Sequence, residues 1–171
     1  FNKKRVSKKE IENNYLGPQY SNDAILKTIK NNKLKYTKTK NIEKFIAKEI
    51  YQGKIVGHFY GPMKFGHRAL GNRSILADPR IKKNKDKVNK LIKFRENFRP
   101  FAPATLIEFS NDIFEMPKKR KVNFMERVYM IKKKWRSKIP AVTHVDGSGR
   151  IQTVSKENNM RFYKIIKEFY D

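Results

Sequence analysis

Apolar side chains recur every three or four residues in several stretches of the chain, the pattern of an amphipathic helix. These stretches predict helices over residues 22–30, 41–52, 81–94 and 159–170, the first capped by Ser21 or Asn22. The apolar side chains expected to face inward are Ile42, Phe45, Ile46, Ile50, Val88, Leu91, Ile92, Phe162, Ile165, Ile166 and Phe169.

Short runs of β-branched and aromatic residues between turn residues predict strands. One covers residues 54–60 and another covers 124–131, while residues 141–146 and 150–154 are expected to form a hairpin around Asp146–Gly149. Strands and helices follow each other without strict alternation. The chain is therefore expected to form a mixed α/β sheet and not a doubly wound one.

Other segments give weaker signals. Residues 32–40 form a polar loop with room for one short strand, and residues 104–115 fit a helix or a strand equally well. Residues 98–103 are expected to be extended, because Pro100 and Pro103 disfavour helix at the residue before each of them.

The composition narrows the function classes. Forty-one basic and 16 acidic residues give a formal charge of +25, which indicates a solvated lysine-rich surface or a track for nonspecific nucleic-acid binding. The absence of cysteine excludes disulfides, cysteine nucleophiles and zinc–thiolate sites, and the three histidines predict no metal cluster. No apolar run is long enough to cross a bilayer and no signal peptide is evident, so a cytoplasmic location without a membrane partner is expected.

Arginine is concentrated in one part of this lysine-rich chain. Residues 1–60 contain thirteen lysines and only one arginine, Arg5, whereas residues 61–80 contain three arginines and one lysine. The arginines in question are Arg68, Arg73 and Arg80, followed by Arg95 and Arg99. A guanidinium can hold two oxygens of an oxyanion at once, which an ammonium cannot do. These arginines therefore indicate an oxyanion site, although pairing with Asp78 and Glu96 explains one or two of them.

Three segments carry the candidate chemistry. Gly66–Ser74 has glycines that expose backbone amides, but it has neither the ending of a Walker phosphate loop nor the dinucleotide fingerprint. Lys93–Pro103 holds Arg99 in a stretch stiffened by two prolines. Its aromatic residues (Phe94, Phe98 and Phe101) are expected in the core, unless one of them supports an adenine ring.

The third segment is Thr143–Gln152. In the expected hairpin, Thr143, Arg150 and Gln152 share one face, which suits a small anionic ligand but is equally compatible with a solvent-exposed face. His144 points the other way and is expected to be structural and not catalytic.

Together these segments resemble a known family. Residues 65–80, 93–103 and 140–147, in this order, are similar to the O-carbamoyltransferases that act on nodulation factors, cephems and aminoglycosides. Leu16–Ser21 also looks like the entry of that family into this region, so the resemblance covers residues 16–170.

The resemblance implies a YrdC-like domain with a twisted mixed sheet and flanking helices, which condenses ATP (with Mg²⁺) and carbamoyl phosphate into carbamoyl adenylate. A separate N-terminal domain, which carries a metal, would pass the carbamoyl group to a hydroxyl of the acceptor. By motif position, Arg68 and Arg99 would bind carbamoyl phosphate, Lys93 the ATP phosphates, and Arg150 the nucleotide or pyrophosphate. Thr143 and Gln152 are further nucleotide-binding candidates.

The chain departs from the family pattern in places. Pro62 and Lys64 replace arginine and glutamate, and His67 replaces proline, close to Arg68. Residues 1–20 are expected to be a basic, extended lead-in, and residues 21–171 the YrdC-like domain, truncated before the last segment of its sheet. Without that segment and the N-terminal domain, the isolated chain is expected to be inactive.

Overall fold

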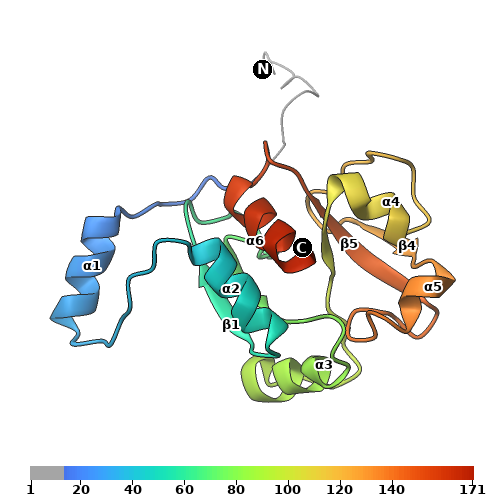
Figure 1. Ribbon diagram of the computed structural model, residues 1–171, viewed down its shortest axis with the longest axis horizontal. Coiled ribbons are helices and arrows are strands. Elements are labelled where there is room, and N and C mark those ends of the chain that lie inside the picture. The colour runs from blue at the N-terminus through green and yellow to red at the C-terminus, as the bar shows by residue number, and fades with distance from the viewer. Residues whose placement is uncertain (1–13) are drawn as a thin grey trace, which may run out of the picture.

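The computed structural model describes residues 14–171, which form helices packed around two small sheets (Figure 1). The helices are α1 (Asn22–Asn31), α2 (Ile42–Tyr51), α3 (Lys83–Val88), α4 (Ser110–Ile113), α5 (Lys133–Arg136) and α6 (Met160–Tyr170), with a π-helical turn η1 (Asn89–Lys93) and a 3-10 turn η2 (Ile107–Phe109). The strands are β1 (Val56–Phe59), β2 (Arg73–Leu76), β3 (Ala104–Leu106), β4 (Arg127–Met130) and β5 (Ser148–Val154). The expected mixed α/β class is confirmed.

Strand β5 is the centre of the larger sheet. It runs parallel to β3 and antiparallel to β4, in the order β3-β5-β4, while β1 and β2 form a separate antiparallel pair. Because successive side chains of a strand point to opposite faces, Ile151 enters a core cluster with Phe114 and Ile131, and Val154 enters another with Phe162. Arg150 and Gln152 share the face of Val154, so the sheet carries polar groups toward the side of α6.

Helices α2 and α6 pack against each other through Ile46, Ile50 and Ile165 (Figure 1). Helix α6 begins at Asn159, whose side chain accepts a hydrogen bond from the backbone N–H of Phe162, and its predicted inward face is confirmed. In α2 the buried stripe is Ile46, Ala47 and Ile50. The sequence-based expectation that Phe45 faces inward is therefore wrong: its side chain is 52% exposed, at the edge of the stripe.

Two expectations for residues 81–94 are also wrong. Val88 is buried as predicted, but Leu91 is 64% exposed, and Ile92 is 39% exposed and belongs to none of the core clusters. The physical reason is the π-helical turn η1, whose wider turn rotates the later side chains out of the 3.6-residue pattern. Phe94 ends this turn in the left-handed conformation, with a φ of 48°.

The predicted hairpin of residues 141–146 with 150–154 does not form. His144 N–H donates to the carbonyl oxygen of Ser148, and Gly147 N–H donates to the carbonyl oxygen of His144. These hydrogen bonds close a tight turn, but the two segments do not pair as strands beyond it. Both edges of β5 are occupied instead by β3 and β4. The turn expected at Asp146–Gly149 does form, but β5 pairs with strands that are distant in the sequence.

The other segments resolve as follows. Residues 104–115, which fitted helix or strand, contain both β3 and the short helices η2 and α4. Residues 32–40 contain no strand. Of the expected lead-in, residues 1–13 lie outside the described residues, and Asn14 and Gly17 form backbone hydrogen bonds with residues 63–65.

Helix α1 projects from the rest of the described chain (Figure 1), and none of its residues is buried. Ser21 caps it, as expected, by accepting from the N–H of Ala24. Within residues 14–171, no helix has both the length and the apolar character needed to cross a membrane.

Gly71, in the loop before β2, packs closely against Phe162 of α6. Its φ is +100°, and a Cβ atom added there would lie 2.5 Å from Cδ1 of Phe162. We expect Gly71→Ala to lower the free energy of unfolding by about 2–4 kcal/mol, from backbone strain and overpacking together. The control is Gly57→Ala in β1, where nothing lies within 4 Å and a change of no more than about 1 kcal/mol is expected. Equal urea midpoints for the two variants would contradict this packing.

Candidate anion-binding site

A cavity of about 380 Å³ lies where β5, α3, α6 and the loop before β2 meet. Its walls combine apolar side chains of α6, such as Phe162 and Ile166, with a group of cationic side chains from distant parts of the chain. These cations are Arg68, Arg73, Lys85, Lys93, Arg95 and Arg150. The cavity therefore joins an apolar wall to a concentrated positive charge.

Arg150 extends from the central strand β5 and is half-buried. Burial lowers the pKa of its guanidinium below the usual value, and the positive charges of Arg68 and Arg95 lower this pKa further. The guanidinium still stays protonated at neutral pH. The charges of Arg68 and Arg95, from two other segments, thus act on Arg150 across this cavity.

Arg95 is held in place by two neighbours. Its Nε donates to Oδ1 of Asn89 over 2.7 Å, and its guanidinium lies 4.7 Å from the centre of the Phe101 ring. Asn89 is fully buried in η1 and also donates to the carbonyl oxygens of Asn97 and Arg99. One buried amide therefore fixes the whole loop that carries Arg95.

The loop that carries Arg68 is fixed at Leu70 and Gly71. The carbonyl oxygen of Leu70 accepts from the Tyr15 hydroxyl at 2.6 Å and from Nε2 of Gln152 at 3.3 Å. The carbonyl of Gly71 lies 2.7 Å from Nδ1 of His58, which must carry the proton of this hydrogen bond. Burial lowers the pKa of His58, so its neutral form is favoured. These contacts leave the loop little freedom next to Arg68.

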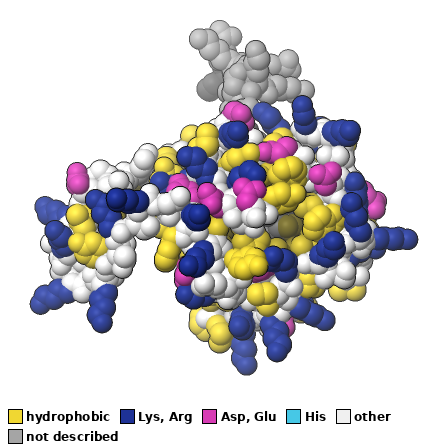
Figure 2. Space-filling model, viewed as in Figure 1, with side chains coloured by type: hydrophobic (Ala, Val, Ile, Leu, Met, Phe, Trp, Pro, Cys, Tyr) yellow, Lys and Arg dark blue, Asp and Glu magenta, His cyan; other side chains and the backbone are white. Residues whose placement is uncertain are grey.

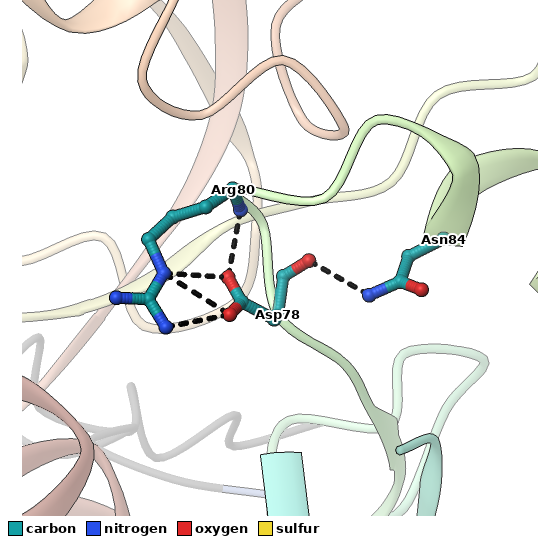
Figure 3. Close-up of polar contacts among 3 residues, drawn as sticks. All are labelled: Asp78, Arg80 and Asn84. Atoms are coloured by element: carbon teal, nitrogen blue, oxygen red, sulfur yellow. Dashed lines mark hydrogen bonds and ion pairs between the residues drawn. The ribbon is translucent and has the colours of Figure 1, made fainter. Parts of the chain in front are cut away.

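Asp78 is the acidic residue in the cavity lining, but its carboxylate is already engaged (Figure 3). Arg80 donates to both carboxylate oxygens, with Nη2 at 2.7 Å from Oδ2, and its backbone N–H donates to Oδ1. Asn84 approaches from α3 and donates to the Asp78 carbonyl at 3.0 Å. Among residues 14–171, Arg68 and Arg150 have no carboxylate partner.

Guanidinium groups that gather beside an apolar wall can bind phosphoryl oxygens of a ligand that also has an uncharged part. The family described as "Carbamoyltransferase C-terminus" matches residues 47–171. The chain belongs to this family.

Several relatives of this chain are nodulation proteins. NolNO of Sinorhizobium fredii is 47% identical over 124 residues, which cover 72% of this chain and 18% of the relative. NolO of Bradyrhizobium diazoefficiens is 38% identical over 159 residues, covering 91% of this chain and 29% of the relative. Nodulation protein U of Rhizobium tropici is 36% identical over 124 residues, which cover 72% of this chain and 21% of the relative. The chain thus spans less than a third of the length of each of these relatives.

The structure brings together most of the residues that the sequence singled out. Arg68, Lys93, Arg150 and Gln152 line the cavity, with Arg150 and Gln152 side by side on one face of β5. Thr143 does not line it, because the expected hairpin is absent; its hydroxyl donates to the carbonyl oxygen of Ile139 at 2.9 Å.

Arg99 also lies outside the cavity lining. Its Nε is 2.9 Å from Oε2 of Glu96, and both side chains are more than half exposed. Of the nearby aromatic residues expected in the core, Phe101 packs against it, but Phe94 and Phe98 are strongly exposed. In the described part of the chain, no group of three or more His, Asp or Glu side chains is placed to hold a metal ion.

Sequence reasoning counted Arg95 among the arginines of the expected oxyanion site but gave it no individual role, and it passed over Asn89. Arg95 lay inside a motif that had been noticed, between Lys93 and Arg99, and a position inside a motif does not tell which guanidinium faces the ligand. Asn89 had a weak signal: it is one of two asparagines in the lysine-rich run of residues 82–90, where an uncharged amide is unusual. Both amides, Asn84 and Asn89, are buried.

Arg150 gives a direct test of the charge cluster. Arg150→Met removes one of three mutually repelling charges, so we expect the free energy of unfolding to stay equal or rise by up to about 1 kcal/mol. At a pyrophosphate concentration of 100 Kd, the wild-type protein should gain about 2.7 kcal/mol, and this gain should be lost in the variant. Thermal unfolding with and without pyrophosphate measures both effects.

The matched control is Arg127→Met, on the exposed side of β4 and outside the cavity lining. It should keep the stabilisation by pyrophosphate. If both variants lose the stabilisation by pyrophosphate equally, its binding depends only on the overall charge of +25.

Proposed function

We propose that this chain is the part of a carbamoyltransferase that binds ATP and carbamoyl phosphate and converts them to carbamoyl adenylate. The observation that supports the proposal is the convergence of Arg68, Arg95 and Arg150 on one cavity, without a carboxylate partner among residues 14–171. Unpaired like charges are unfavourable in the empty protein, and an anionic reactant removes this cost on binding.

The reaction demands such a site. Carbamoyl phosphate, ATP and one water give carbamoyl adenylate, pyrophosphate and orthophosphate. Water cleaves the P–O bond between the phosphorus and the carbamoyl oxygen of carbamoyl phosphate, which releases orthophosphate and leaves carbamate. An oxygen of the carbamate then forms a bond to the α-phosphorus of ATP, and the bond from this phosphorus to the oxygen bridging to the β-phosphate breaks, which releases pyrophosphate. Both reactants are strongly anionic, so alignment and charge neutralisation are the main tasks of the protein.

The cationic side chains divide this work. Arg68, in the loop before β2, and Arg150, on β5, bind the phosphate of carbamoyl phosphate and the departing pyrophosphate. Arg95, braced by Phe101 and Asn89, supplies the third guanidinium, while Lys93 at the end of η1 contacts the ATP phosphates together with Mg²⁺. Arg99 takes part only when its exposed ion pair with Glu96 opens.

Transfer of the carbamoyl group belongs to another part of the protein. The relatives are more than three times as long as the stretch that they share with this chain, which leaves room for an N-terminal domain that holds the acceptor. This domain is the partner that we propose for the carbamoyl adenylate, and it would provide the metal-dependent transfer to a hydroxyl group.

The surface charge provides the contrast for the test. On the face seen in Figure 2, Lys and Arg side chains are spread over the α1 arm and the main body, interrupted by acidic and apolar side chains. Binding of nucleic acid to such a surface falls steeply with salt and does not distinguish nucleotides. Binding of ATP in the cavity depends on individual arginines instead.

The decisive assay is ATP–pyrophosphate exchange in the full-length protein. We expect exchange that requires carbamoyl phosphate, that persists at moderate salt, and that falls about 100-fold or more in Arg68→Met, because one fixed charge-assisted contact to the reacting phosphates is lost. Arg127→Met serves as the control and should exchange at the wild-type rate. A folded full-length protein without exchange would refute the proposal.

A further inference from the structure

Gln152 has an open hydrogen-bonding position at the cavity. Its side chain is on β5, is only 3% exposed, and belongs to the cavity lining. Nε2 donates to the carbonyl oxygen of Leu70 at 3.3 Å, but Oε1 is buried and has no hydrogen-bond partner. A buried amide oxygen without a partner costs about 1–3 kcal/mol, so a donor from the occupant of the cavity would stabilise it.

The orientation of this amide follows from its neighbours. The Leu70 carbonyl can only accept, so the nitrogen of the Gln152 amide must face it and the oxygen must face away. Tyr15 also donates to the same carbonyl, at 2.6 Å. The contact between Gln152 and Leu70 is therefore not needed to satisfy that carbonyl, and Gln152 is free to serve another purpose.

The open acceptor lies close to the cation cluster. Arg150 is two residues away on the same face of β5, a spacing of about 6.6 Å along a strand. A ligand that spans both groups needs an anionic end that contacts Arg150 and an N–H donor that reaches Oε1 of Gln152. Carbamoyl phosphate has both ends, since its amino group is separated from the phosphate by one carbonyl carbon.

We propose that Oε1 of Gln152 accepts a hydrogen bond from the amino group of carbamoyl phosphate and thereby selects this substrate over acetyl phosphate. This assignment rests on the function proposed above. Acetyl phosphate has a methyl group of nearly the same size where carbamoyl phosphate has the amino group, so shape alone separates the two poorly. The methyl group leaves the amide oxygen unpaired, which gives an expected preference of about 10- to 100-fold.

Asn84 carries another buried oxygen without a partner, Oδ1, in the same cavity. Its amide nitrogen is held by the carbonyl of Asp78, at the start of the Asp78–Arg80 ion pair (Figure 3). Arg80, the guanidinium next to it, is already neutralised by Asp78 and does not line the cavity. Gln152, two residues from an unpaired guanidinium, is therefore the better partner for the amino end of a small acyl phosphate.

The test uses two stable analogues and the full-length protein. Phosphonoacetamide carries the amino group, and 2-oxopropylphosphonate carries a methyl group in its place; inorganic phosphate reports the anion site alone. Calorimetric titration of the wild-type protein should show phosphonoacetamide binding about 10- to 100-fold more tightly than 2-oxopropylphosphonate. In Gln152→Met this ratio should fall to near one, while the affinity for phosphate stays unchanged.

Arg150→Met is the comparison variant. It should weaken all three ligands together and keep the ratio between the two analogues. The assignment to Gln152 is overturned by equal binding of the analogues in the wild-type protein, by a ratio that survives Gln152→Met, or by a parallel loss of phosphate in that variant. If the two analogues bind equally to the wild-type protein and Arg150→Met weakens the binding of both, the anion site is supported although the role of Gln152 is not. If none of the three ligands binds, the proposed function is refuted as well.

Discussion

Electrostatic repulsion between guanidinium groups is concentrated at one cavity, where Arg68, Arg95 and Arg150 meet although they come from three separate segments. Burial lowers the pKa of Arg150, and the positive charges of Arg68 and Arg95 lower it further. Flexible side chains of like charge would move apart into water. They stay together because the segments that carry them are fixed: β5 is paired on both edges, and a buried amide holds the loop of Arg95.

Several local irregularities of the structure lie at or beside the same cavity. Helix α3 widens into the π-helical turn η1, which ends at Lys93, and Phe94 follows in a left-handed conformation while 84% exposed. Gln152 and Asn84, in the cavity lining, each leave a buried oxygen without a partner. Such departures cost stability, and in proteins they are frequent where a ligand binds.

The sequence predicted those parts of the fold that depend on local pattern. The apolar spacing in residues 159–170 identified α6 and its inward face, and Ser21 identified the start of α1. It failed where a distant partner or an unusual backbone decides the outcome. The pairing of β5 with β3 and β4 is absent from any local pattern, and the π-helical turn at Asn89 exposed Leu91 against its expected position.

The candidate site shows the same division. Arg68, Lys93, Arg150 and Gln152 were found through the resemblance of their segments to a family, and all line the cavity. The choice between neighbouring arginines depended on three-dimensional structure, because only the fold shows that Glu96 pairs with Arg99 while Arg95 lies near Arg150. Thr143 was named through the same resemblance and through a strand pairing that does not form, and it does not line the cavity.

If these guanidinium groups form one binding site for phosphoryl oxygens, a heavy tetrahedral oxyanion should occupy it. Anomalous diffraction from crystals of the protein soaked in tungstate would locate such an ion. We expect a strong peak in the cavity, within hydrogen-bonding distance of Arg150 and at least one of Arg68 and Arg95. A peak only at exposed lysines, with the cavity empty, would contradict it.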